Sequence, residues 1–315
     1  MKSLLLVNLL CFLANMVFAQ IKFDYTGADV VIDYFLNDKK ENIPGIINHP
    51  GYLHVFEHSK KYSSTPLDQE SLKSSLSGQS NGFDYTNIDE RLDTLRQIIT
   101  NLKANEQLMN DDFGKLTLRY LPNDYKQNAA VFFIAGGYNG IAMGGKIAMN
   151  IDWKQFRKDK QEIFLYLSHE LFHIGFEQYQ TAPDVFSIKT VDDLKKIIMY
   201  YTMNEGIATL VPYEYRIMID AIKDYDYSVL TDSALLSQKL QQFNKLMKEI
   251  EVKKDSLISN ELLNKALGEC SGDRLFYIAG CYMGHKIERK HGRSMLIELI
   301  KKSPAEFFEV FDKIE

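Results

Sequence analysis

Two histidines four positions apart, with a glutamate directly after the first, are the residues of this sequence best suited to chemistry. They are His169 and His173, with Glu170 between them, inside an apolar segment, residues 161–178, whose pattern predicts a helix. Positions four apart share a face of a helix, so both imidazoles could bind one zinc ion from the same side. Glu170 would then stand beside the ion as a general base, taking a proton from the attacking water and passing it to the leaving amine.

A second pattern, formed by His54, Glu57 and His58, has the inverted order His-x-x-Glu-His. From the composition of the chain, both patterns are equally unlikely to occur by chance. The residues around each pattern therefore have to decide which one is the metal site. The stretch around His54 is short and soon turns polar, whereas His169 and His173 lie in a segment that is apolar on nearly all sides. A buried polar group without a partner is costly, so the later histidines need one. We therefore expect the metal site at the later pattern.

Zinc held by two histidines needs a third protein ligand. Glu177 continues the face of His169 and His173, but three residues on one straight helix span about 12 Å and cannot converge on one tetrahedral ion. We therefore expect Glu177 to be a solvent-exposed or supporting residue. A histidine six positions after His173 would indicate a three-histidine site, but that position is Tyr179.

The better candidate for the third ligand is Glu205, in the segment Met-Asn-Glu-Gly-Ile-Ala of residues 203–208. After a loop through Pro183, this predicted helix could return antiparallel to the first and present Glu205 to the metal. The small residues of the segment suit such a contact, because a glycine inside a helix costs about 1 kcal/mol and needs compensating packing. The alternative is that Glu205 is an ordinary exposed helix glutamate.

His-Glu-Leu-Phe-His followed by Asn-Glu-Gly-Ile-Ala resembles the gluzincin metallopeptidases, and most closely the secreted bacterial zinc-dependent peptidases of unassigned substrate. The resemblance, carried by residues 168–208, implies one Zn²⁺ ion with His169, His173 and Glu205 as ligands and Glu170 as general base. It also implies an α+β, zincin-like fold. In such a fold a small sheet with a Gly-rich edge strand precedes the active-site helix and a mainly helical C-terminal half.

Two features depart from the pattern of that family. The 31 residues between His173 and Glu205 exceed the gap that is usual in zinc aminopeptidases. Residues 144–150 occupy the place of the substrate-binding edge strand, but they lack the acidic residue that captures a substrate's amino terminus there. This glycine-rich backbone could pair with an extended peptide as an added strand, or it could be a tight hairpin and nothing more.

Peptide hydrolysis also needs a donor for the oxyanion, and the family often uses a tyrosine or histidine downstream of the glutamate ligand. Tyr282 and His285 share a face of a predicted helix, residues 276–290, and are the catalytic residues that we expect there. Tyr277 on the same helix is the other contender. The alternative for each is ordinary packing, which is the usual role of a buried tyrosine.

The remaining pattern predicts an N-terminal α/β part with the sheet, residues 20–155, and a helical part with the metal site, residues 156–315. In the first part we expect a helix over 29–36 closed by a break at Pro44 and Gly45, a flexible loop over 63–81, a helix over 88–108, and strands over 116–121, 130–135 and 146–151. The helix over 88–108 should turn Leu92, Leu95, Ile98, Ile99 and Leu102 inward. In the second part we expect further helices over 191–222 (split at Pro212), 230–250, 257–267, 276–290 and 294–301.

Residues 1–19 predict a secretory signal peptide, because a lysine precedes the apolar run 4–18 and a small-residue cleavage site ends at Ala19. We therefore expect a secreted or periplasmic protein with no integral membrane span after cleavage. In an oxidising compartment the two remaining cysteines, Cys270 and Cys281, could form a disulfide or stay two buried thiols.

The formal charge is 37 − 42 = −5, or 36 − 42 = −6 once Lys2 is removed, so no basic surplus favours nucleic acid as a partner. The expected function is a secreted zinc-dependent metallopeptidase that hydrolyses peptide or protein substrates. Two alternatives are a zinc-dependent amidohydrolase with a closed pocket for a non-peptide substrate, and a non-catalytic exported zinc-binding protein. Glu170 argues against the last, because a structural zinc ion needs no carboxylate beside it.

Overall fold

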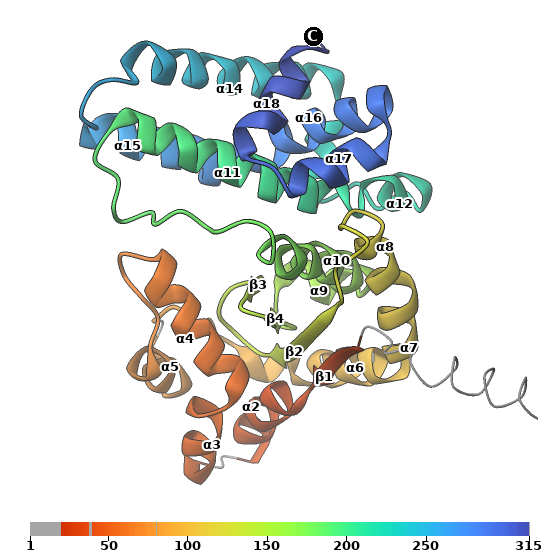
Figure 1. The fold of residues 1–315 in the computed structure, drawn as a ribbon. Coiled ribbons are helices and arrows are strands. Elements are labelled where there is room, and N and C mark those ends of the chain that lie inside the picture. Colours follow the sequence, from red (N-terminus) through yellow and green to blue (C-terminus); the bar gives the residue numbers. More distant parts are fainter. Residues whose placement is uncertain (1–19, 38–39, 80, 315) are drawn as a thin grey trace, which may run out of the picture.

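The computed structural model describes residues 20–37, 40–79 and 81–314. It has a small sheet with helices in the first half of the chain and helices alone in the second half (Figure 1). Helix α10 (Gln161–Phe176) lies between these two halves. The predicted α+β architecture is therefore confirmed, with its small sheet and helical C-terminal half. The predicted signal peptide lies outside the described residues.

The sheet has four strands in the order β1-β2-β4-β3, namely β1 (Gln20–Asp24), β2 (Asn128–Ile134), β4 (Lys146–Asn150) and β3 (Gly140–Met143). Strands β1 and β4 run parallel to β2, and β3 runs antiparallel to β4. The strands predicted over 130–135 and 146–151 are confirmed as β2 and β4. Strand β1 was not predicted.

Strands β3 and β4 form a hairpin whose two connecting residues are Gly144 and Gly145. Both have positive φ angles, 58° and 78°. A two-residue turn with positive φ at both positions has the same twist as the two strands that it joins, and glycine adopts this conformation without strain. The tight hairpin expected at residues 144–150 is therefore present. The assignment of these residues to the sheet edge is wrong, because β4 pairs with β2 on one side and β3 on the other. The edge strand is β3.

Helices α2 and α4 of the first half pack on the sheet, and the other helices there pack against these two, against one another or against α10. The predicted helix over 29–36 is confirmed as α2, and the one over 88–108 is a 3₁₀ turn followed by α6 and α7, with all five predicted inward residues buried. The elements are α2 (Thr26–Asn37), α3 (Ile43–Ile47), α4 (Pro50–Tyr62), α5 (Gln69–Leu76), α6 (Leu92–Ala104), α7 (Glu106–Leu108), α8 (Lys115–Leu118) and α9 (Lys154–Lys158), with short turns η1 (Lys40–Asn42), η2 (Ile88–Arg91) and η3 (Met109–Gly114).

Two irregular segments of the first half are more helical than predicted. Pro44 does not mark a break but lies in the first turn of α3, where its missing N–H costs nothing. The segment over 63–81 contains α5, because Asp68 caps it by accepting from Ser71 N at 2.7 Å and the leucines at positions 72 and 76 are buried. The sequence did not predict this helix, because the segment is rich in serine and has only two apolar side chains that pack against the core.

The predicted strand over 116–121 is also wrong, because the chain forms α8 there. Its alternating pattern is short, and the buried side chains are those of Thr117, Tyr120 and Leu121, which is helical spacing. The Thr117 hydroxyl contacts the carbonyl oxygens of Phe113, at 3.1 Å, and Ser168, at 3.0 Å. This contact fixes α8 against α10.

The second half consists of helices joined by turns and loops. The predicted split at Pro212 is confirmed, because α11 ends before it and α12 begins after it. Helix α18 was not predicted. The elements are α11 (Val191–Leu210), α12 (Tyr213–Met218), α13 (Tyr225–Thr231), α14 (Ser233–Lys253), α15 (Asn260–Leu267), η4 (Gly268–Gly272), α16 (Leu275–His291), α17 (Arg293–Ile300) and α18 (Pro304–Asp312).

Helix α10 belongs to two hydrophobic cores at once. One core surrounds the sheet and includes Ile163 and Leu171 of α10, and the other lies among α11, α14 and α16 and includes Phe172 and Phe176 of α10. Thirteen of the 16 residues of α10 are buried. A helix that is apolar nearly all round is stable only when it is enclosed, which explains its position between the two halves.

Helices α11 and α16 approach each other closely at two glycines. A Cβ atom added to Gly280 would lie 1.9 Å from the carbonyl oxygen of Thr202, and one added to Gly206 would lie 2.3 Å from the Gly280 Cα. No side chain fits at either position, so the backbones are in direct contact. This accounts for the glycine directly after Glu205, inside a helix where it would otherwise be unfavourable.

Cys270 and Cys281 are two free, buried thiols, which decides between the two predicted possibilities. Burial raises the pKa of both thiols, so they remain protonated and pack as small apolar side chains.

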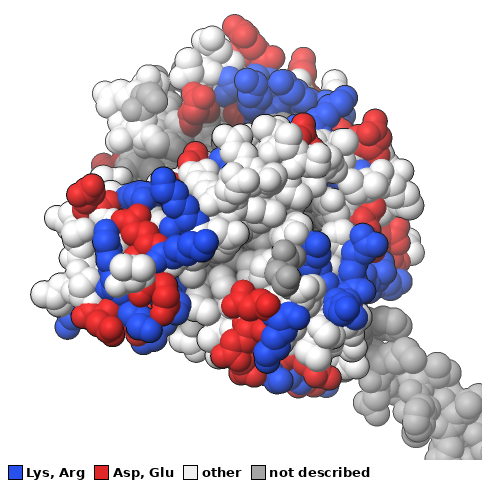
Figure 2. All heavy atoms as spheres, turned by 90° about the horizontal axis from the view of Figure 1, so that it is seen from above, with Lys and Arg blue, Asp and Glu red and all other residues white. Residues whose placement is uncertain are grey.

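Among the described helices, none is long and apolar enough to cross a membrane. On the face of the helical half that Figure 2 shows, acidic and basic residues lie in small mixed groups with uncharged surface between them.

Candidate metal centre

The three predicted ligands come from two neighbouring helices. His169 and His173 lie one turn apart on α10, and Glu205 lies near the C-terminal end of α11. Helix α11 starts at a capping box, in which Thr190 and Asp193 each bond to the other's backbone N–H. The loop of residues 177–190 thus ends at a defined position, from which α11 runs back to α10 and turns Glu205 toward it.

The ligand atoms of these three residues converge on one point. Glu205 Oε2 lies 3.3 Å from His169 Nε2 and 3.3 Å from His173 Nε2, and the two Nε2 atoms are 3.1 Å apart. Zinc bonds of about 2.0–2.1 Å in tetrahedral geometry place ligand atoms about 3.3–3.4 Å apart. The residues present therefore fit one zinc ion, with a fourth position left for water or substrate. Within the described residues, this is the group of His, Cys, Asp and Glu side chains that could hold a metal.

Asn204 holds His173 in the orientation that a metal ligand needs. His173 Nδ1 donates to Asn204 Oδ1 over 2.9 Å, which leaves Nε2 as the ring nitrogen that faces Glu205 and the candidate metal position. Asn204 and Glu205 are adjacent in sequence, so α11 supplies both a ligand and the support of another ligand.

The carboxyl group of Glu170 is buried between α10 and the edge strand β3. A Cβ atom added to Gly140 would lie 2.9 Å from Glu170 Oε1, so the glycine makes room for this group. Burial raises the pKa of Glu170 to about 7, which is the range in which a carboxylate can both accept and return a proton. Glu170 thus has the surroundings of a general base.

The Glu205 carboxylate is ionised and places a negative charge at the candidate metal position. Burial alone would raise the pKa of Glu205, but the charge of His173 and hydrogen bonds from both imidazoles lower it well below its ordinary value. The carboxylate in turn raises the pKa of His173 to about 9, against the opposing effect of burial. The three groups are strongly coupled, and an ionised carboxylate beside two imidazoles favours a cation in their midst.

The ligands open onto a cavity of about 520 Å³. Its walls come from both halves of the chain, and they include Asn139 and the residues Gly140, Ile141 and Ala142 of the edge strand β3. Tyrosines line much of the rest, at positions 62, 166, 200, 201, 227 and 277. A cavity of this size with a sheet edge in its wall can admit a segment of extended chain.

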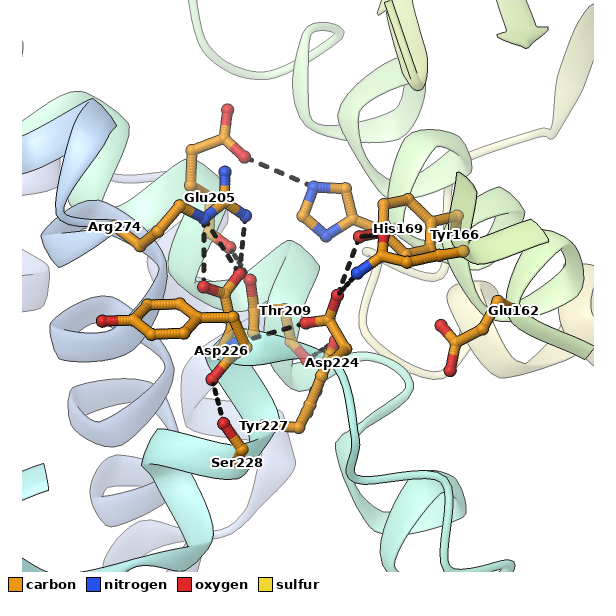
Figure 3. A network of polar contacts seen from close by, with 12 residues as sticks. Glu162, Tyr166, His169, Glu205, Thr209, Asp224, Asp226, Tyr227, Ser228 and Arg274 are labelled. Carbon is orange, nitrogen blue, oxygen red and sulfur yellow. Dashed lines mark hydrogen bonds and ion pairs between the residues drawn. The ribbon is translucent and has the colours of Figure 1, made fainter. Parts of the chain in front are cut away.

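One wall of the cavity is a polar network that starts at Tyr166 on α10 (Figure 3). The Tyr166 hydroxyl donates to Asp224 Oδ2 at 2.9 Å, and Asp224 Oδ1 accepts from Asp226 N at 3.2 Å. Asp226 pairs with Arg274 through the Nε and Nη2 atoms, with a shortest contact of 2.5 Å. The network ties the N-terminal part of α10 to the start of α16.

Tyr282 and His285 do not line this cavity, although both are on α16 as predicted. The Tyr282 ring packs against Phe311 with centroids 6.0 Å apart, and the His285 ring packs against Tyr213 at 5.4 Å. Both therefore lie on faces of α16 that pack against other helices. Tyr277, the third contender, lines the cavity with its ring stacked 6.2 Å from that of His169.

The inverted pattern on α4 does not form a second metal site. His54 is 1% exposed, whereas Glu57 points outward and lies 3.9 Å from Lys146, so the two side chains diverge. His58 lines the cavity wall. Glu177 accepts from Gly144 N at 2.8 Å and supports the hairpin turn.

Two imidazoles and a carboxylate around one point, beside a buried carboxyl group, are the donor set of a zinc-dependent hydrolase. The chain belongs to the family of putative zinc-dependent peptidases (DUF5700), whose family model matches residues 43–314. Neither a curated protein nor a solved structure matches the chain.

Sequence reasoning assigned no role to Asn204 or to Arg274 and its partner Asp226. Asn204 could have been found, because it precedes the glutamate ligand in the motif that resembles zinc aminopeptidases. Arg274 has no comparable signal, because it lies in a segment of irregular pattern 69 residues after Glu205 and reaches the cavity only through the tertiary fold.

Proposed function

We propose that this chain is an exported gluzincin-type metallopeptidase that binds one zinc ion through His169, His173 and Glu205 and hydrolyses peptide bonds with Glu170 as general base. The observation that carries the proposal is the triangle of ligand atoms with edges of 3.1–3.3 Å, beside the buried carboxyl group of Glu170. Export rests on the pattern of residues 1–19.

The mechanism divides the work among a few side chains. Zinc bound at this site supplies Lewis-acid polarisation of a carbonyl group and of a water molecule. Glu170 accepts the proton of the attacking water on a carboxylate oxygen and returns it to the leaving amine. Asn204 keeps His173 in the tautomer that ligates. Tyr277 is the contender that lines the cavity, and because burial raises the pKa of its hydroxyl, it stays protonated and can donate to the developing oxyanion.

A peptide is the substrate class that the cavity wall favours. Strand β3 uses one edge for β4, and residues of β3 line the cavity, so an extended peptide can add to the sheet as a further strand. This favours a peptidase over the amidohydrolase alternative, since a non-peptide amide would make no use of a strand edge. The buried Glu170 carboxyl likewise favours an enzyme over a zinc-binding protein without activity.

The test of the proposal is the variant Glu170→Gln in the purified protein, with a mixed peptide library as substrate. We expect one zinc per chain to be retained and hydrolysis to fall by a factor of about 10²–10⁴, because general-base catalysis is lost. Glu205→Ala should instead lose zinc, measured by metal analysis. Glu57→Gln is the matched control, because it changes the glutamate of the other histidine pattern outside the cavity, and its activity should equal that of wild type. Undiminished turnover by Glu170→Gln would remove this residue from the mechanism.

A further inference from the structure

The cavity has two chemically different ends, which α10 and β3 define together. Glu170 packs against Gly140 at the start of β3, and Glu177, directly after the C-terminal end of α10, accepts from Gly144 N just beyond the end of β3. Helix α10 and strand β3 therefore run in the same direction. Tyr166, one turn before Glu170, marks the opposite end of the cavity from Glu177.

Arg274 lies at the Tyr166 end and is held there by fixed partners. Its Nε and Nη2 atoms donate to Asp226, and Asp226 connects through Asp224 to the Tyr166 hydroxyl. Its guanidinium lies over the Tyr277 ring, 3.3 Å from the centroid. Its backbone φ is 65°, a left-handed conformation that is rare for arginine and that persists only where the surrounding structure enforces it.

Part of this guanidinium remains available for a ligand. Asp226 uses Nε and Nη2, whereas Nη1 has no hydrogen-bond partner among the described residues, and the side chain is 33% exposed. In Figure 3 the end of the guanidinium that bears no dashed line points away from Asp226, on the side of Glu205. The other arginine of the cavity wall differs, because both Nη atoms of Arg216 are bonded to Glu162 and its side chain is 1% exposed.

We propose that Arg274 binds a carboxylate of the substrate on the C-terminal side of the scissile bond, an inference that rests on the proposed peptidase function. The carboxylate is either the C-terminus of a peptide or an Asp or Glu side chain. Nη1 and the second N–H of Nη2, which Asp226 does not use, form a parallel pair of donors that matches a carboxylate. Helix α16 adds to this, because it begins directly after Arg274 with no side-chain cap, so the N–H groups of its first turn favour an anion.

The direction of the peptide agrees with this assignment. A strand that adds antiparallel to β3 runs from Met143 toward Gly140, so its C-terminal part continues past Gly140 toward the Tyr166 end. The carboxylate side of the substrate then meets Arg274. The N-terminal part points toward Glu177, whose carboxylate has a charge that suits an amino group. The two ends of the cavity thus match the two ends of a short peptide.

The competing explanation is that Arg274 only neutralises Asp226. Both roles would make the arginine necessary for a well-packed cavity, so loss of activity on its own does not distinguish them. The two roles differ in how activity depends on the substrate. If Arg274 only neutralises Asp226, activity does not depend on a substrate carboxylate, whereas recognition by Arg274 requires one.

The experiment compares three peptides of otherwise equal sequence in the zinc-loaded, full-length protein. The first has a free C-terminal carboxylate, the second a C-terminal amide, and the third a C-terminal amide with a Glu in place of Gln on the C-terminal side of the cleaved bond. We expect wild type to favour the first or the third over the second by about tenfold or more in kcat/KM, and which of them is favoured identifies the source of the carboxylate. Arg274→Gln should remove this preference, and Arg274→Lys should restore part of it.

The controls separate folding, charge and chemistry. Arg274→Gln/Asp226→Asn removes both charges of the pair, so no unpaired carboxylate is left. It replaces Arg274→Gln in the comparison with wild type if the single variant does not fold. Lys239→Gln removes a positive charge that contacts Asp273 outside the cavity, and its carboxylate preference should equal that of wild type. An equal loss by Arg274→Gln on all three peptides, or no preference in wild type, would overturn the proposal.

Peptide binding to Glu170→Gln, measured by fluorescence anisotropy with the same labelled peptides, keeps this inference apart from the proposed function. Carboxylate-dependent binding that disappears when Arg274→Gln is added supports the inference even if wild type hydrolyses none of the peptides. Hydrolysis without carboxylate preference supports the peptidase and contradicts the role of Arg274.

Discussion

The side chain of Asn204 shows how one amide can orient a candidate metal ligand. His173 has two ring nitrogens, and the hydrogen bond of 2.9 Å from Nδ1 to Asn204 Oδ1 leaves only Nε2 as a lone-pair donor. The same hydrogen bond fixes the rotation of the ring. The geometry of the candidate centre therefore depends on a residue that need not touch the ion.

We expect Asn204→Ala to weaken zinc binding by about 10- to 100-fold, which is the usual effect of losing the partner of a ligating histidine. The measurement is a competition with a chelator of known affinity. Asn264→Ala, which removes an exposed amide from α15, is the matched control and should bind zinc as wild type does. Equal affinity of both variants would show that packing alone orients His173.

At this scale the sequence allowed the convergence of His169, His173 and Glu205 to be predicted, but not the surroundings of these side chains. The spacing of His169 and His173 forces both onto one helix face, and the glycine after Glu205 indicates a close helix contact. Arg274 could not be predicted, because its position depends on where the turn η4 ends and α16 begins. Tyr282 and His285 were placed on α16 from the sequence, but which face of α16 meets the cavity depends on how α16 packs against α11 and α18.

Among the elements, the contact between α11 and α16 determines where Glu205 lies. The backbones touch at Gly206 and Gly280, so any added atom has to push the helices apart. Since Glu205 precedes Gly206, a shift of α11 moves the carboxylate away from the histidines of α10. Packing and metal geometry are coupled at this point.

We therefore expect Gly280→Ala to destabilise the protein by about 1–3 kcal/mol or more and to lower its zinc content, because the new methyl group overlaps the carbonyl of Thr202. Thermal unfolding and metal analysis measure the two effects. Gly268→Ala is the control, because a Cβ atom there meets nothing within 4 Å, and it should be neutral or slightly stabilising. A wild-type melting temperature for Gly280→Ala would contradict the close contact.

Long apolar elements were predicted well and short ones were not. Helices α10 and α11 and strand β2 are confirmed, since each has a sustained pattern that tertiary contacts do not override. The segment that forms α8 alternates over only a few residues, and such a pattern fits a strand or a helix equally well. Its hydrogen bond from Thr117 to Ser168 of α10, which fixes it as a helix, is invisible in the sequence.

For the whole molecule, the two halves are joined by α10 and by a buried ion pair. Arg216 on α12 donates from both Nη atoms to Glu162 on α10, at 2.8 and 2.7 Å. Both side chains are largely shielded from water, at 1% and 9% exposed. Removal of one partner leaves the other charge buried and unpaired, which is far more costly than loss of a surface pair.

We expect Arg216→Met to lower the free energy of unfolding by about 3–5 kcal/mol, and Arg216→Met/Glu162→Gln to recover part of the loss. Denaturant unfolding measures both. Lys196→Met is the control, because its pair with Asp192 is exposed on the surface of α11, so its loss should change the free energy of unfolding much less. Equal effects of Arg216→Met and Lys196→Met would mean that the buried Arg216–Glu162 pair contributes no more to stability than an exposed pair.

Strand β3 has only four residues, and its free edge lies in the wall of a cavity. Exposed sheet edges tend to pair with the edges of neighbouring molecules, and many proteins protect them by shortening or covering them. Here the position of β3 in the cavity wall protects its free edge, because the cavity is too narrow for another folded sheet but has room for a single extended strand. The same depth that would let the sheet accept a substrate therefore also protects this edge from aggregation.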